Sequence, residues 1–206
     1  LTFCGKCVEY CEFNAIVVIP SIRFAEATPE LCHSCGACQA ACQDNAIKEK
    51  PRLIGQITTF STQEGNKLME GKLEIGSAMQ TMVIKKLKQE AGRQGGIILF
   101  DAPPGTSCPV VATVYDADYI ILVTEPTPFG LHDAKLTIEM LRQMNKSFGV
   151  IINKAGLGNG QLHHYLISEN IAVLGEIPFD KTYASSYASG SLLNNITTDI
   201  TSIYKH

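Results

Sequence analysis

The stretch CGKCVEYCEFNAI, from Cys4 to Ile16, returns as CGACQAACQDNAI, from Cys35 to Ile47. The three cysteines, the first glycine and the closing Asn-Ala-Ile keep their positions in both copies, which indicates an internal duplication. Cys32 precedes the second copy, so that this copy reads C-x2-C-x2-C-x3-C. Seven of the eight cysteines lie in this first quarter of the chain, and their spacing decides how we interpret it.

The cysteine spacing is typical of a 4Fe-4S site. In C-x2-C-x2-C-x3-C the first three thiolates bind one cluster and the fourth reaches a second cluster. Zinc sites are usually built from two C-x2-C pairs with a longer spacer between them. A disulfide framework would need an oxidising compartment, and no signal peptide is visible in the sequence. We interpret the seven cysteines as cluster ligands, with zinc and disulfides as the alternatives.

On these motifs residues 1–50 resemble the bacterial two-cluster ferredoxins, which implies a small α+β domain with two 4Fe-4S clusters. The implied ligands of one cluster are Cys32, Cys35, Cys38 and Cys11, and those of the other are Cys4, Cys7 and Cys42. The second set is one ligand short, because the expected position is Leu1. Such a site could hold a 3Fe-4S cluster or a 4Fe-4S cluster with an open iron. A first residue other than methionine instead favours a truncated sequence. The proline common after the fourth cysteine is Glu12 in one copy and Gln43 in the other.

Composition excludes several classes of function. The 206 residues carry a formal net charge of -3 with acids and bases interspersed, so no basic patch points to nucleic acid and no polybasic segment to a membrane surface. No apolar stretch has the length of a membrane span. We expect a soluble, cytoplasmic protein.

The sequence after residue 50 predicts a second domain, residues 51–206. Two extended segments flank a polar turn and indicate a hairpin, and an apolar stripe with helical spacing follows. These elements are Arg52–Phe60, the turn Ser61–Asn66, Lys67–Ile75 and the helix Ala78–Arg93.

Four continuous apolar runs then alternate with helical stretches such as Leu131–Met144, which is typical of a parallel, doubly wound α/β sheet. The runs are Ile97–Phe100, Tyr119–Val123, Val150–Ile152 and Ile171–Leu174. In such sheets ligands bind beyond the carboxyl ends of the strands. The segments at those ends are Asp101–Gly105, Thr124–Thr127, Asn153–Lys154 and Pro178–Asp180.

Asp101 follows an apolar run and precedes Pro-Pro-Gly, which is the Walker B arrangement for a carboxylate that supports a magnesium ion on a nucleotide phosphate. An aspartate after a strand is equally often a turn or helix cap. Cys108, in the loop that follows, is either a small buried residue or a reactive thiol.

Together with Asn153–Lys154 and Pro178–Asp180, the stretches FDAPPGTSCPV and TEPTPFGLHD resemble the MinD superfamily of P-loop ATPases, in the branch with an inserted ferredoxin domain. The resemblance covers residues 52 to 190. It implies a P-loop NTPase-like sheet and an ATPase that dimerises around ATP and Mg²⁺, with itself or with a paralogue. The implied site residues are Asp101 near magnesium, Pro104, Gly105, Thr106 and Ser107 at the terminal phosphate, and Asn153, Pro178 and Asp180 at the adenine.

The chain departs from that superfamily because nothing in it matches GxxxxGK[ST]. Gly156–Gly160 has no following lysine or hydroxyl residue, and we interpret it as a mobile strand-to-helix loop rather than a phosphate site. We therefore expect an incomplete sheet that lacks the first strand and the P-loop, and no ATP hydrolysis by this sequence alone.

Two hypotheses of function follow. In the first, the protein is an iron–sulfur ATPase that couples ATP binding or hydrolysis to electron transfer, or to delivery of a cluster or metal, with a redox protein or an iron–sulfur acceptor as partner. In the second, it is a ferredoxin-type electron carrier whose α/β part is a docking scaffold without hydrolytic activity.

Overall fold

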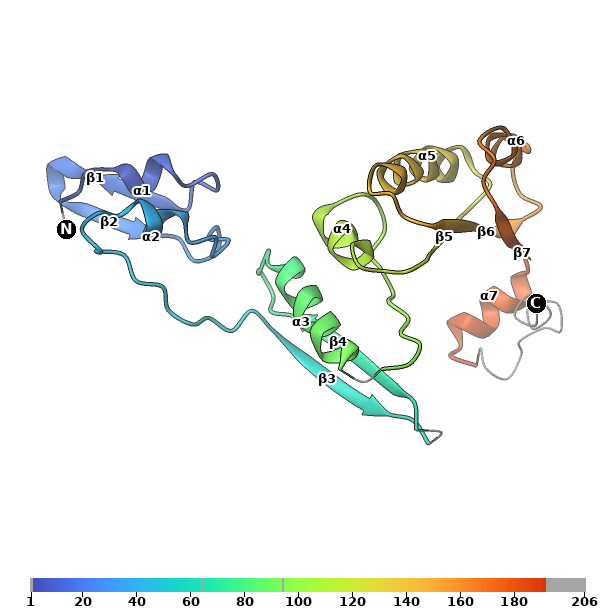
Figure 1. The fold of residues 1–206 in the computed structure, drawn as a ribbon. Coiled ribbons are helices and arrows are strands. Elements are labelled where there is room, and N and C mark those ends of the chain that lie inside the picture. The colour runs from blue at the N-terminus through green and yellow to red at the C-terminus, as the bar shows by residue number, and fades with distance from the viewer. Residues whose placement is uncertain (1, 64, 94, 192–206) are drawn as a thin grey trace. The chain divides into compact units, whose positions relative to one another are not determined.

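The computed structural model describes residues 2–63, 65–93 and 95–191 (Figure 1). Contacts within the chain divide it into two compact units. The first unit ends at Phe100 and the second begins at Asp101. The domain boundary that we place after residue 50 lies inside the first unit, and the end of the proposed second domain, 192–206, lies outside the described residues. No helix in the described ranges is long and apolar enough to cross a membrane.

The first unit contains two antiparallel pairs of strands. Its elements are α1 (Lys6–Glu9), β1 (Ile16–Ile19), the 3-10 turn η1 (Pro20–Ile22), β2 (Phe24–Ala27), α2 (Ala37–Ala41), β3 (Gly55–Ser61), β4 (Lys67–Leu73) and α3 (Gln80–Gly92). The hairpin and the following helix that the sequence predicts are β3, β4 and α3. The turn between the strands includes residue 64, which is outside the described residues.

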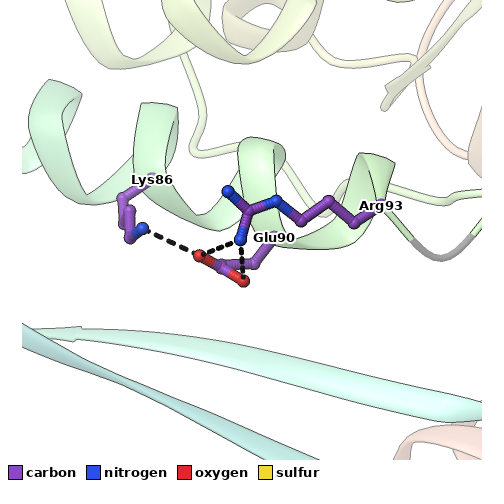
Figure 2. Close-up of polar contacts among 3 residues, drawn as sticks. All are labelled: Lys86, Glu90 and Arg93. Atoms are coloured by element: carbon purple, nitrogen blue, oxygen red, sulfur yellow. Dashed lines mark hydrogen bonds and ion pairs between the residues drawn. The ribbon is translucent and has the colours of Figure 1, made fainter.

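Helix α3 lies along the β3–β4 hairpin (Figure 1). Val83 packs against two glycines of the hairpin, since a Cβ atom placed on Gly71 would stand 2.9 Å from its Cγ1 and one on Gly55 3.0 Å from its Cγ2. On the surface of the helix, Glu90 Oε1 lies 2.8 Å from Lys86 Nζ, and Glu90 Oε2 lies 3.2 Å from Arg93 Nη1 (Figure 2). These pairs join residues three and four positions apart, which are neighbours on a helix.

The second unit is built on a three-stranded parallel sheet with the strand order β5-β6-β7. Its elements are α4 (Cys108–Val114), β5 (Ile120–Thr124), α5 (Pro128–Gln143), β6 (Phe148–Ala155), α6 (Gln161–Ser168), β7 (Val173–Pro178) and α7 (Lys181–Ala188). Three of the four predicted apolar runs contribute to these strands, and the predicted helix is α5. The α/β class with a parallel sheet is confirmed.

The core of the second unit lies between the sheet and the helices α5 and α6. Its buried side chains are Ala134, Ile138, Val150, Ile152, Leu162 and Leu166. A smaller cluster joins Leu141 of α5 to Val110 and Val114 of α4. On β5 exposure alternates, and Ile121 and Val123 remain more than half exposed. Because neighbouring side chains of a strand point to opposite faces, the face of β5 opposite the core presents these exposed apolar side chains.

The prediction of a strand at Ile97–Phe100 is wrong. The segment has no strand conformation, and Ile97 and Leu99 are 95% and 88% exposed. An apolar run forms a strand only when a neighbouring strand supplies its hydrogen bonds. Among the described residues β5 pairs with β6 alone, so Ile97–Phe100 is not bonded to the edge of this sheet. Asp101 therefore follows a segment without strand conformation, outside the sheet.

Candidate functional site

The two cysteine copies adopt the same backbone conformation. A glycine in the left-handed region begins each short helix, Gly5 with φ 81° before α1 and Gly36 with φ 76° before α2. Asn14 and Asn45, which follow the last cysteine of each copy, are also left-handed, with φ 51° and 49°. Glycine and asparagine tolerate this conformation best. The duplication in sequence is therefore also a duplication in local structure.

Backbone amides point at the cysteine sulfurs in both copies. The amide of Ala15 donates a hydrogen bond of 3.3 Å to Sγ of Cys11, and the amide of Ala46 donates one of 3.3 Å to Sγ of Cys42. A third bond of 3.4 Å runs from the amide of Ser34 to Sγ of Cys32. Hydrogen bonds to sulfur stabilise the thiolate form and help to set the reduction potential of an iron–sulfur cluster.

All seven cysteines line one cavity with a volume of about 1220 Å³, and all are free thiols. The set is Cys4, Cys7, Cys11, Cys32, Cys35, Cys38 and Cys42. Among the described residues no three acidic, histidine or cysteine side chains are arranged to hold a single metal ion. A 4Fe-4S cluster binds each thiolate on a different iron, so its ligands stand farther apart than those of one ion. Seven free thiols around one cavity, with amides directed at three of them, fit iron–sulfur clusters.

The thiols do not share one electrostatic environment. A hydrogen bond from the backbone of Lys6 lowers the pKa of the Cys4 thiol. The charge of Asp44 acts in the opposite direction. At Cys38 burial raises the pKa of the thiol, and the charges of its neighbours Cys32 and Cys35 add to this effect. The ligand that binds iron is the thiolate, so the lower pKa eases ligation at Cys4.

The cysteine segment has almost no apolar core of its own. Of residues 2–50 only Ala15 is buried, at 2% exposure. A chain segment of this size cannot offset the entropy of its ordering by hydrophobic burial alone. In small domains of this kind, metal binding contributes to the free energy of folding. A bound iron–sulfur cluster would therefore take the place of a hydrophobic core in this segment.

Two side-chain contacts join the copies across the cavity, and the sequence patterns did not point to them. The rings of Phe13 and His33 stack with centroids 3.8 Å apart and an interplanar angle of 11°. The hydroxyl of Thr2 donates a hydrogen bond of 2.6 Å to Oδ2 of Asp44. All four residues line the cavity. Comparison of equivalent positions in the two copies is the signal that could have found them.

In the second unit, two of the predicted nucleotide segments meet at the carboxyl edge of the sheet. Asn153 in β6 lies opposite Ile177 of β7, and Ala155 lies opposite Pro178. Asp180 caps α7, because its Oδ1 accepts a hydrogen bond of 2.7 Å from the amide of Thr182. The half-buried Asn153 and the exposed Pro178–Asp180 therefore occupy neighbouring positions.

The other predicted nucleotide residues are exposed and precede the first strand of the sheet in the sequence. Asp101 and the loop Pro104–Ser107 are exposed, and Ser107 is the residue before α4. They belong to a segment that precedes β5, whereas Asn153 lies at the end of β6. Cys108, the first residue of α4, is exposed, so the expectation of a small buried cysteine is wrong.

The loop that follows β5 is tied to the end of β6 at the same edge. Lys154 Nζ lies 2.6 Å from Oε1 of Glu125, and both side chains are less than half exposed. Gly156–Gly160 connects β6 to α6, which is the strand-to-helix position that we expect for it. No residue of this loop supplies a lysine for a phosphate group.

Comparisons with known proteins agree with both halves of the structure. The 4Fe-4S binding domain family matches residues 26–48. The chain is 28% identical over 191 residues to Uncharacterized protein MJ0579 of Methanocaldococcus jannaschii, covering 90% of this chain and 65% of that protein. It is 30% identical over 178 residues to Uncharacterized protein MJ0578 of the same organism, covering 86% of this chain and 59% of that protein. The chain thus spans less than two thirds of the length of these two relatives.

A solved structure, the MinD cell division protein of Aquifex aeolicus, is similar to the chain with a TM-score of 0.50 and 20% sequence identity. The similarity covers 66% of this chain and 59% of that one. At this identity the similarity shows the fold alone. The fold expected from the sequence motifs is therefore confirmed, and the chain joins a ferredoxin-type 4Fe-4S binding domain to an α/β domain with the MinD-like fold.

Proposed function

We propose that this protein is an iron–sulfur protein of the MinD-like ATPase type, in which ATP binding or hydrolysis is coupled to electron transfer or to delivery of a cluster or metal. One observation carries the proposal. Seven free cysteines line a single cavity, in a chain that shares the fold of the MinD cell division protein. The bound clusters would supply one-electron chemistry or transferable iron and sulfide.

The cysteine ligands divide into two sets in this proposal. Cys32, Cys35, Cys38 and Cys11 hold one cluster, and Cys4, Cys7 and Cys42 hold the other. The sulfur-directed amides of Ala15 and Ala46 support this division, because they bond to Cys11 and Cys42, the two cysteines that cross to the opposite cluster.

The nucleotide lies at the carboxyl edge of the sheet in this proposal. Asn153, Pro178 and Asp180 contact the adenine, and their neighbouring positions on β6, β7 and the cap of α7 support this assignment. Asp101 stands near magnesium, and Pro104, Gly105, Thr106 and Ser107 face the terminal phosphate. The exposed position of that loop leaves it accessible to a nucleotide or to a second subunit.

The coupling is tested on the endogenous protein by recording the EPR spectra of its reduced clusters with and without MgATP. We expect MgATP to change the spectra and MgADP to change them differently. Asp101→Asn should raise the MgATP concentration that produces half of the spectral change by about 10–100-fold, because the carboxylate orients the metal ion in this proposal. Asp118→Asn is the matched control, because Asp118 is also an exposed aspartate but stands at the amino end of β5, away from the carboxyl edge proposed for the nucleotide. EPR spectra that do not change on addition of MgATP would count against the proposal.

A second function has its own support. Asp101 is exposed and does not follow a strand. This position favours a ferredoxin-type electron carrier whose α/β unit is a docking scaffold. This alternative predicts reversible reduction at low potential without affinity for nucleotide, and equilibrium dialysis with labelled ATP distinguishes the two.

The partners follow from the proposed chemistry. A redox protein or an iron–sulfur acceptor exchanges electrons or clusters with the cysteine domain. The α/β unit dimerises with a second copy or a paralogue, as the MinD-like fold suggests. We place the protein in the cytoplasm, because free thiols persist in a reducing compartment.

A further inference from the structure

The two contacts that join the cysteine copies occupy equivalent positions but differ in chemistry. Phe13 and Asp44 each stand two residues after the last cysteine of their copy. His33 and Thr2 each stand two residues before the first cysteine of their copy. The duplication thus relates the Phe13–His33 ring stack to the Thr2–Asp44 hydrogen bond. Where one half of the domain has two rings, the other half has a carboxylate and a hydroxyl.

Each contact belongs to one proposed set of cluster ligands. Phe13 and His33 flank Cys11 and Cys32, in the set with four cysteines. Asp44 follows Cys42, in the set with three cysteines, where the spacing leaves Leu1 in place of the fourth. Leu1 itself lies outside the described residues. The carboxylate therefore stands on the side of the domain that is short of one ligand.

The position of Asp44 suits a ligand. Asp44 and Thr2 line the same cavity as the three cysteines of that set, and the charge of Asp44 acts on Cys4. The carboxylate accepts the Thr2 hydrogen bond on Oδ2, which leaves Oδ1 for a metal. A carboxylate that binds metal is commonly held by such a hydrogen bond from a neighbour. Carboxylates also bind iron, although they are harder ligands than thiolates.

We propose that Asp44 supplies the fourth ligand of the cluster held by Cys4, Cys7 and Cys42, with Thr2 orienting its carboxylate. The inference rests on the proposed division of the cysteines into two sets. One corner of this cluster then has an oxygen ligand, and its iron exchanges more readily than the irons bound by sulfur. Uptake of that iron is balanced without a further reactant, since a reduced 3Fe-4S cluster and one ferrous ion together supply all the atoms and electrons of a 4Fe-4S cluster.

The test measures how tightly the full chain holds that iron. The protein is reconstituted with iron and sulfide, oxidised briefly so that labile iron leaves, and re-reduced with dithionite. Ferrous ion is then titrated in, and the loss of the integer-spin EPR signal of the reduced 3Fe-4S cluster is followed directly in the reduced samples. We expect Asp44→Asn to weaken uptake by at least about tenfold, the size of effect seen when a group that supports a metal site is removed. Thr2→Val should weaken uptake less, because the carboxylate remains.

Glu12→Gln is the matched control. Glu12 is an exposed carboxylate one residue after Cys11, and it does not line the cavity. The change also gives the first copy the glutamine that the second copy has at Gln43. We expect uptake of iron equal to that of the unchanged protein. An equal loss in Glu12→Gln and Asp44→Asn would overturn the proposal, because it would mark a general effect of charge.

A second variant separates ligation from damage to the fold. Leu1→Cys supplies the thiolate that the spacing expects, so Asp44→Asn should have no effect on iron uptake in that background. If it weakens uptake just as strongly there, Asp44 is not the ligand. The cluster of the four-cysteine set is an internal reference: its loss along with the other would show that the proposed ligand sets are wrong. If that reference cluster is retained in Asp44→Asn and iron uptake is unchanged, Asp44 is not a ligand, whereas the division of the cysteines into two sets stands.

Discussion

Gly158 lies against the backbone of Pro126, so closely that a Cβ atom placed on Gly158 would stand 1.8 Å from the Pro126 carbonyl oxygen. This approach joins the loop after β6 to the loop after β5 at the carboxyl edge of the sheet. Gly158 also has φ 83°, in the left-handed region. Position 158 thus has two requirements that glycine meets: a left-handed backbone conformation and the absence of a side chain.

Gly158→Ala tests this packing. We expect a lower free energy of unfolding, measured by urea denaturation followed by circular dichroism. Gly156→Ala is the control, because Gly156 is also left-handed, with φ 91°, but a Cβ atom placed on it would meet no heavy atom within 4 Å. The control should lose about 1–2 kcal/mol for its conformation. The clash in Gly158→Ala should add about 1–3 kcal/mol to that loss. Equal losses would show that Pro126 moves aside freely.

Leu166→Ala probes the core between the sheet and α6. Leu166 is fully buried, whereas the next residue, Ile167, is 76% exposed. Truncation of a buried leucine removes apolar contacts and leaves a cavity, so we expect a loss of about 2–5 kcal/mol in urea unfolding. Ile167→Ala should change the free energy of unfolding by less than about 0.5 kcal/mol. Similar losses in the two variants would mean that α6 packs by a different face.

Much of the fold could be predicted from local patterns. The hairpin β3–β4, the helix α5 and the strands β5, β6 and β7 follow from runs of apolar residues whose length and period identify them. The segment Ile97–Phe100 has the same local pattern and is not a strand. Its conformation depends on a neighbouring strand rather than on its own residues, and no local pattern contains that information.

The cysteine site divides in the same way. Spacing alone indicated an iron–sulfur domain, because cluster ligands must recur at fixed intervals on short loops. The contact between Thr2 and Asp44 joins residues far apart in the sequence, and neither is a cysteine of the repeated pattern. Comparison of equivalent positions in the two copies could have pointed to both residues, but only the fold shows the hydrogen bond between them. The residues expected around a nucleotide were found by resemblance, and their roles stay predictions.

The ion pairs of α3 make a prediction about pH. Hydrogen bonding to Lys86, together with the charges of Arg93 and Lys86, lowers the pKa of Glu90 below its ordinary value of 4.5 (Figure 2). A lowered pKa means that the charged form stabilises the fold. This contribution is complete above pH 4.5 and is lost as the pH falls through the lowered pKa. At neutral pH it is present in full.

Lys86→Gln should raise the pKa of Glu90 toward its ordinary value, because the largest cause of the shift is removed. Lys85→Gln, the adjacent lysine, is the control and should leave that pKa unchanged. An NMR titration of the Glu90 carboxyl group measures both variants. High salt should reduce the difference between them, since exposed ion pairs are screened. A Glu90 pKa that is the same in both variants would mean that Arg93 alone holds the carboxylate.

Removal of iron should unfold one part of the chain and leave another intact. Residues 2–50 bury only Ala15, whereas the core of the second unit joins two helices to the sheet. We therefore expect the cysteine segment to depend on bound iron and sulfide for its stability. After chelation of iron under reducing conditions, hydrogen exchange should become fast at β1 and β2 and stay slow at α5 and β6. Reconstitution with iron and sulfide should restore protection at β1 and β2. Slow exchange at β1 and β2 in the iron-free chain would show that this part of the protein is stable without a cluster. Folding of the cysteine segment would then not be coupled to iron binding, and the prediction would be wrong.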